Sequence, residues 1–162
     1  MNTLEVDQFW NDLKSFDMCM LVTRDANFMR SRPMKAHFID DDGTVRFLTS
    51  IDTHKVEEIA ANPVANLVFV KPDDNSWISV SGAVRISVDR PDVDMLWDKN
   101  ANSWMPAGKD EAAILIVEPD IAEYWSYPES ELRAKWELLK GELTGVPPDL
   151  GDNQKVQFDQ AS

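Results

Sequence analysis

The chain has 162 residues, 43% of them apolar and 28% charged, which predicts one soluble domain with a core of its own. Its net charge of -13 argues against nucleic acid or an anionic membrane as a partner. The single cysteine, Cys19, excludes an intrachain disulfide, and no apolar run approaches the roughly 20 residues that span a bilayer. The first residues carry no signal-peptide pattern, so we expect a cytoplasmic protein.

The first third of the sequence predicts a helix followed by strands. Val6, Phe9 and Leu13 recur at helical spacing behind Thr3, which is a suitable helix cap. We expect the strands that follow to form an antiparallel meander. The predicted elements are a helix over 3–16, strands over 18–23, 32–39 and 44–49, and a turn or loop at 24–29.

The remaining sequence continues with strands separated by short helices. Gly82 interrupts an alternating run and predicts a β-bulge, while Pro63 ends one helix and Asp89 caps another. Most connections are too short for parallel crossovers, so the pattern indicates a mainly antiparallel barrel of six or seven strands with peripheral helices. The expected elements are helices over 52–62, from Asp89 onward and over 129–143, and strands over 64–70, 76–88, 112–119 and 120–126. We expect a single domain over 1–145 and a tail over 146–162.

Several familiar chemistries find no support in the sequence. Two histidines seventeen residues apart, His37 and His54, and one cysteine match no metal-binding spacing. There is no GxSxG nucleophile, GxGxxG turn or P-loop. Cys19 lies in an apolar run and is interpreted as a packing residue.

The distribution of charge singles out the segment RSRPM, at 30–34. From Arg24 to Lys55 there are six basic and five acidic residues, a net of +1, so the rest of the chain carries -14. Arg30 and Arg32 share one face of a strand, whereas Lys35 faces the other side. A small anionic ligand would explain this local reversal of charge, and solvated charges on a strand face would also be consistent with it.

A second basic element stands where a predicted strand runs into a helix. Thr49 and Ser50 end the strand, and Thr53, His54 and Lys55 begin the helix. Free amides and a positive partial charge make a helix N-terminus suited to phosphate. An arginine from a neighbouring strand would clamp the same phosphate, and the hydroxyl groups would meet the polar edge of a flat ring.

The ordered motifs MRSRPMK, VRFLTS, DTHKVEEIAANP, SWISVSG and AEYW resemble the flavin-binding split-barrel superfamily of pyridoxamine 5'-phosphate oxidase, in particular its general stress protein branch. The resemblance runs from about Phe9 to Trp125 and continues into PDLGDNQKV. It implies a split β-barrel, a homodimer and FMN bound at the dimer interface. It also implies a stress-related flavin oxidoreductase whose reductant would be a reduced nicotinamide.

The resemblance also implies roles for individual residues. Arg30 and Lys55 would hold the phosphate, assisted by Thr53 and His54, although the oxidases usually carry an arginine in place of His54. The ring and ribityl chain would be bordered by Ser31, Arg32, Lys35, Thr49 and Ser50, covered by Trp104, and approached from the partner subunit by Trp77 and Trp125. For these three tryptophans, a purely structural role in packing is an equal alternative.

One departure from the oxidases limits the predicted activity. After Trp125 the oxidases carry arginines and a histidine that grip the substrate phosphate, whereas SYPESELRAKWELLKG has no histidine and only Arg133. Oxidation of a vitamin B6 phosphate is therefore not expected. Alternatives are a non-catalytic flavin-binding or flavin-buffering protein, the same fold with FAD, a deazaflavin or haem, and a structural dimer with an empty groove.

Overall fold

The computed structural model describes residues 3–39, 42–126 and 152–158 of the chain. The helix predicted over 129–143 lies outside these residues. No helix in the described segments is long and apolar enough to cross a membrane. The helices are α1 (Thr3–Leu13), α2 (His54–Ala61), α3 (Arg90–Leu96) and α4 (Ala101–Trp104). The strands are β1 (Met18–Asp25), β2 (Phe28–Lys35), β3 (His37–Ile39), β4 (Thr44–Ser50), β5 (Val64–Lys71), β6 (Ser76–Ser87), β7 (Ala112–Ser126) and β8 (Asp152–Gln157).

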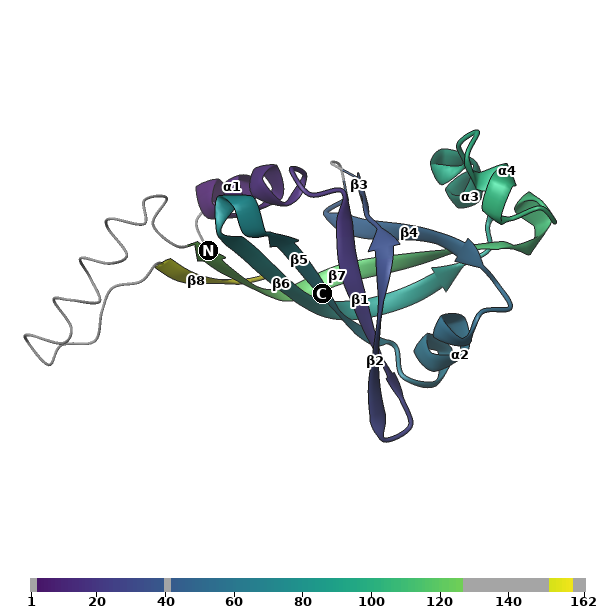
Figure 1. Cartoon of the computed structure of the whole chain (residues 1–162), viewed down its shortest axis with the longest axis horizontal. Helices are drawn as coiled ribbons and strands as arrows, with labels where there is room; N and C mark the ends of the chain where they lie inside the picture. The colour runs from purple at the N-terminus through teal and green to yellow at the C-terminus, as the bar shows by residue number, and fades with distance from the viewer. Residues whose placement is uncertain (1–2, 40–41, 127–151, 159–162) are drawn as a thin grey trace, which may run out of the picture.

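One antiparallel sheet organises the molecule, in the order β2-β1-β5-β6-β7-β4-β3, with β8 paired to β7 (Figure 1). The strands β2 and β3 stand at opposite ends of this order, yet only Ala36 separates them in the chain. The sheet must therefore curl until its two ends meet, as in a barrel. This confirms the mainly β, antiparallel architecture with peripheral helices, and the tail contributes β8 beyond the six or seven strands expected.

The meander expected from the first three strands has its two antiparallel pairings, but its middle strand is not continuous. The predicted strand over 32–39 breaks at Ala36, whose amide donates to the carbonyl of Asp17 at 3.0 Å. As a result β2 pairs with β1, while β3 pairs with β4 at the other end of the sheet. The turn or loop predicted at 24–29 is shorter than expected: β1 and β2 continue to a two-residue turn at 26–27, in which Ala26 has a φ of 50°.

Within the described segments, the core consists of two apolar clusters on opposite faces of β4 and β7. Leu115 and Val117 point into the barrel interior beside Phe47, and α1 contributes Phe9 and Leu13 to the same cluster. The second cluster packs α3 and α4 against the outer face of the sheet and consists of Leu48, Val93, Leu96, Ala101, Met105, Ala112, Ile114 and Ile116. The run AAILIV is continuously apolar because both of its faces are buried.

The bulge predicted at Gly82 is confirmed, and it joins two predicted strands into one. The residues 112–126 form the single strand β7, in which Ile121 pairs with Ser81 and Pro119 with Gly82. Asp120 is the extra residue between these pairs. A Cβ at position 82 would collide with the carbonyl oxygen of Glu118, so this close approach of two backbones requires glycine.

Candidate functional site

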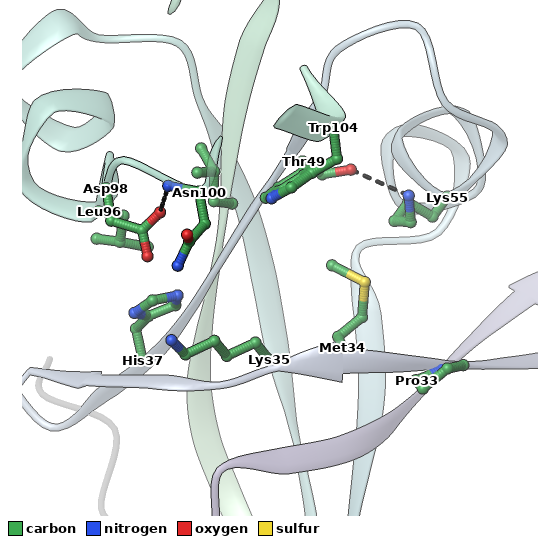
Figure 2. Close-up of a pocket in the computed structure, with 11 residues that line it drawn as sticks. Pro33, Met34, Lys35, His37, Thr49, Lys55, Leu96, Asp98, Asn100 and Trp104 are labelled. Carbon is green, nitrogen blue, oxygen red and sulfur yellow. Dashed lines mark hydrogen bonds between the residues drawn. The ribbon is translucent and has the colours of Figure 1, made fainter. Parts of the chain in front are cut away.

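A cleft of about 390 Å³ opens where β2, β3, β4, α2 and the segment between α3 and α4 meet (Figure 2). It is lined by Pro33, Met34, Lys35, His37, Leu48, Thr49, Lys55, Leu96, Asp98, Asn100 and Trp104. Apolar side chains and a few polar groups line it together, as in sites that hold a flat organic ligand. The curl of the sheet creates this cleft, because it brings β2 and β3 opposite the end of β4.

One end of the cleft is formed by the first turn of α2. Thr53 has an extended backbone, with φ of -87° and ψ of 147°, and makes no side-chain cap hydrogen bond to that turn. Its hydroxyl instead donates to the carbonyl of Ser50 at 2.9 Å. The Val56 amide donates to the carbonyl of Thr53 at 2.9 Å, so the amides of His54 and Lys55, which precede it, are the ones that can meet an outside acceptor. The positive end of the helix dipole lies beside them.

Lys55 supplies a full positive charge at this end. Its Nζ donates to Thr49 Oγ1 at 3.0 Å, which holds the ammonium at the wall of the cleft (Figure 2). Burial lowers the pKa of Lys55, and the charge of Arg32 lowers it further, while Glu58 opposes both effects. A partly desolvated ammonium of this kind is stabilised when an anion binds beside it.

Arg32 is held by two neighbours rather than being free in solvent. Its Nη2 donates to Glu58 Oε2 at 2.7 Å and its Nη1 donates to Thr23 Oγ1 at 2.5 Å. The Thr23 hydroxyl donates in turn to the same carboxylate oxygen of Glu58. Three elements, β1, β2 and α2, are joined by this arrangement.

Arg30 and His54 lie on the solvent side of the same elements. Arg30 is exposed, and its Nη1 lies 3.5 Å from a carboxylate oxygen of Asp25. His54 has a side chain that is 93% exposed, and its Nδ1 lies 3.3 Å from Glu57 Oε2. Both side chains are exposed to solvent, and neither lines the cleft.

The other end of the cleft is formed by Lys35, which the sequence indicated, and by three residues that it did not indicate. In Figure 2 the side chains of Lys35, His37, Asp98 and Asn100 gather there. Burial lowers the pKa of His37, and Lys35 lowers it further against the opposing charge of Asp98. Asp98 Oδ1 accepts from the amides of Asn100, at 2.7 Å, and Ala101, at 3.0 Å, which fixes the entry into α4.

Of the residues predicted for the site, the structure brings four to the cleft: Lys35, Thr49, Lys55 and Trp104. Arg30, Ser31, Arg32, Ser50, Thr53 and His54 lie on the flanking elements without lining it. The sequence reasoning missed Pro33, Met34, His37, Leu48, Leu96, Asp98 and Asn100. The capping pattern of Asp98 was a usable signal for a helix start, but nothing in the sequence placed that start over β4.

Trp77 and Trp125 lie far from the cleft of their own chain. They are direct cross-strand partners on β6 and β7. Ser50, beside the cleft, pairs with Ala112 at the opposite end of β7. The indoles of the same chain therefore do not reach its cleft, and their predicted approach from a partner subunit stays a prediction.

Comparison with known proteins finds a family match over most of the chain. The profile of a family described as "Pyridoxamine 5'-phosphate oxidase like" matches residues 5–149. Among proteins with curated descriptions, a search finds no match.

Solved structures share the fold over nearly the whole chain. A candidate general stress protein 26 from Jannaschia sp. CCS1 has 26% identity and a TM-score of 0.70, covering 97% of this chain and 100% of its own. The general stress FMN/FAD binding protein of Xanthomonas citri has 27% identity and a TM-score of 0.67, covering 80% and 93%. A candidate general stress family protein from Xanthomonas campestris pv. campestris has 28% identity and a TM-score of 0.67, covering 80% and 92%. With a family match over most of its length and a sheet that curls as a split barrel does, the chain belongs to the pyridoxamine 5'-phosphate oxidase-like family.

Proposed function

We propose that this protein binds FMN non-covalently in the cleft and serves as a flavin-dependent oxidoreductase. The observation that carries the proposal is the ammonium of Lys55, partly buried and aimed along the cleft wall beside the uncapped first turn of α2. A phosphate dianion would supply the charge that this end of the cleft lacks. The Xanthomonas citri relative is named as an FMN/FAD binding protein, which agrees with a flavin phosphate as the ligand.

The residues present fit the parts of FMN. Lys55 and the amides of the first turn of α2 would hold the phosphate, joined by Arg30, Thr53 and His54 after modest side-chain movement. The ribityl chain and ring would be bordered by Ser31, Arg32, Lys35, Thr49 and Ser50. Trp104, whose side chain is half exposed over the cleft, would cover the ring.

When bound, the flavin supplies the hydride and electron transfer, and the protein supplies orientation and electrostatics. Met34 and Leu48 provide apolar walls that exclude water from the ring. His37 is held neutral at pH 7 by its lowered pKa, so the cleft offers a neutral imidazole beside Lys35 rather than a second fixed cation. No protein acid or base is needed for the transfer itself.

We also propose that the protein works as a homodimer. One face of the barrel carries uncovered apolar side chains: Met18, Val64, Val70 and Ile121 are each at least 43% exposed. They lie on β1, β5 and β7, on the same outward face as Trp77 and Trp125. A second copy is the occupant we favour, because it would cover this face and bring its own Trp77 and Trp125 toward the cleft.

A second function remains open, in which the protein holds or buffers flavin without turnover. The observation that favours it is the segment after Trp125, which lacks the basic residues that grip a substrate phosphate in the oxidases. Under either function, the cofactor and the cleft are the same.

The deciding experiment is the absorbance spectrum of the purified protein together with the mass of the ligand released on denaturation. We expect flavin absorbance and the mass of FMN. A Soret band, or the mass of FAD or a deazaflavin, would contradict FMN as the cofactor. Turnover with reduced nicotinamides, measured against free FMN at equal concentration, then separates the oxidoreductase from the non-catalytic binder.

A further inference from the structure

Glu58 is a buried carboxylate that is not itself among the residues proposed to contact the cofactor. Only 7% of its surface is exposed, although it lies on a two-turn helix at the edge of the barrel. Carboxylates are rarely buried to this extent unless they are paired. Its partners are Arg32, at 2.7 Å, and the hydroxyl of Thr23.

The three side chains form a closed arrangement in which each contacts the other two. Arg32 donates one nitrogen to Glu58 and another to Thr23, and Thr23 donates to Glu58. A guanidinium that spans two acceptors has a fixed orientation, and buried charge-assisted hydrogen bonds are stronger than neutral ones. The strand β2 is therefore fastened to α2 through a contact between residues 26 positions apart in the chain.

Arg32 and Glu58 each lie close in the chain to one of the two proposed phosphate ligands. Arg30 precedes Arg32 by two residues on β2, so both project from the same face of that strand. Lys55 precedes Glu58 by three residues on α2, so both lie on neighbouring positions of one helix face. The contact between Arg32 and Glu58 therefore joins the strand that carries Arg30 to the helix that carries Lys55.

We propose that Arg32 and Glu58 are a positioning pair that holds Arg30 and Lys55 at the separation a phosphate monoester requires. The inference rests on the proposed binding of FMN and assigns Arg32 an indirect role, through Glu58, in addition to any contact with the flavin. Glu58 also offsets part of the electrostatic repulsion between Arg32 and Lys55.

The opposing effects of Arg32 and Glu58 on the charge of Lys55 support the proposal. Around the first turn of α2, Arg32 lowers the pKa of Lys55 and Glu58 raises it. Removal of the Glu58 charge would leave Arg32 uncompensated beside Lys55 and Arg30. Arg32 would then lose its carboxylate partner and the link from β2 to α2, and a loosely held cation contributes less to binding than a preorganised one.

The test uses the ratio of the dissociation constants for riboflavin and FMN, because these ligands differ only in the phosphate. Glu58→Gln keeps the size of the side chain and removes its charge. We expect this variant to lose about tenfold of the preference for FMN, or about 1.4 kcal/mol, while its affinity for riboflavin changes little. An unchanged ratio, or a ratio shifted toward FMN because a released Arg32 binds the phosphate itself, would overturn the proposal.

A merely structural role is excluded with the double variant Arg32→Met/Glu58→Leu. Replacement of a buried ion pair by apolar residues of similar volume often leaves folding stability unchanged. We expect the melting temperature to return toward that of the parent while the ratio stays low. A ratio that recovers together with stability would show that the pair only supports the fold and would overturn the proposal.

The matched control is Leu67→Ala on β5, which removes a fully buried side chain from the barrel core. It should lower the melting temperature and leave the ratio unchanged. Failure of the proposed function is distinguishable from failure of this inference. A parent protein that does not prefer FMN over riboflavin refutes the phosphate site itself, whereas a preference that survives Glu58→Gln refutes only the positioning pair.

Discussion

The Nζ of Lys55 lies 3.0 Å from the Oγ1 of Thr49, across the corner where β4 gives way to α2. The hydrogen bond keeps a long, flexible side chain from extending into solvent. Thr49 is itself only 2% exposed, so the acceptor is fixed by the surrounding sheet. The ammonium is thus placed before any ligand arrives, which reduces the entropy that binding must otherwise remove.

Lys55→Ala is expected to weaken FMN binding while leaving riboflavin binding nearly unchanged. Loss of a charge-assisted contact costs about 1.5–3 kcal/mol, which corresponds to roughly tenfold or more in affinity. Arg30→Ala should act in the same direction. Quenching of flavin fluorescence measures both constants, and Lys14→Ala, an exposed lysine of the segment after α1, is the control. If both variants bind FMN as tightly as the parent protein, Lys55 and Arg30 do not hold the phosphate.

The affinity for FMN is expected to fall as the pH rises through the pKa of Lys55, which lies below the ordinary lysine value of 10.5 because of burial and then Arg32. Above that pKa the amine is neutral and the phosphate loses its partner. The folding stability of the ligand-free protein changes in the opposite direction. Because Lys55 binds its proton more tightly in the unfolded chain, stability increases as the pH rises from the lowered pKa of folded Lys55 toward 10.5. Riboflavin affinity should show no such alkaline decrease, and a parallel decrease would contradict the assignment.

Mixing of subunits is expected to recover a flavin site from two defective chains. If Trp125 reaches the cleft of a partner, then a heterodimer of Lys55→Ala and Trp125→Ala subunits has one site with both defects and one intact site. The measurement is the FMN stoichiometry after the two variants are unfolded together and refolded. Approximately a quarter of all sites should be intact, since half of randomly paired dimers are mixed. No recovery would place Trp125 outside the site.

Gly82→Ala is expected to destabilise the protein strongly. The added Cβ meets the carbonyl oxygen of Glu118, which is backbone and cannot rotate away. Overpacking of this kind costs about 1–3 kcal/mol or more, visible as a lower melting temperature. Val88→Ala, at an exposed position just beyond β6, should change stability by no more than about 0.5 kcal/mol. A parent-like melting temperature for Gly82→Ala would mean that the two backbones separate freely there.

Cys19 is expected to resist thiol reagents in the folded protein. Burial raises the pKa of its thiol to about 12, so almost no thiolate exists at neutral pH. Its side chain also belongs to the barrel core. Labelling followed by mass spectrometry should be slow in buffer and fast in denaturant. Rapid labelling of the folded protein would indicate that β1 opens readily.

Elements with a strong local pattern could be predicted from the sequence. The helix before β1 and the helix after Thr53 follow apolar spacing and caps, and Gly82 signals its bulge because only glycine tolerates the backbone approach. Edge strand β2 carries no such pattern, since most of its residues are exposed on both faces. The end of β2 before Ala36 could therefore not be predicted from the sequence.

The site was predictable only where the residues lie close together in the sequence. Thr49 and Lys55 flank one turn, so their meeting follows from local structure. Asp98 and Asn100 reach the cleft through the packing of α3 and α4 on β4, which depends on contacts between distant segments. The contact of Arg32 with Glu58 is of the same kind, because strand order decides it and strand order was not readable from the first three strands.

The bulge in β7 reverses the alternation of side chains along the strand, so that odd-numbered residues face inward before it and outward after it. Before it, odd-numbered Leu115, Val117 and Pro119 face inward; after it, even-numbered Ala122 does, and Trp125 faces out. A strand that kept Asp120 in regular pairing would turn the indole of Trp125 into the barrel, whereas a chain without Asp120 would keep both faces and lose only the bend. Because Gly82 leaves room for the bulge, the indole of Trp125 stays on the outer face of the sheet, at the end of β7 opposite the one that pairs with Ser50.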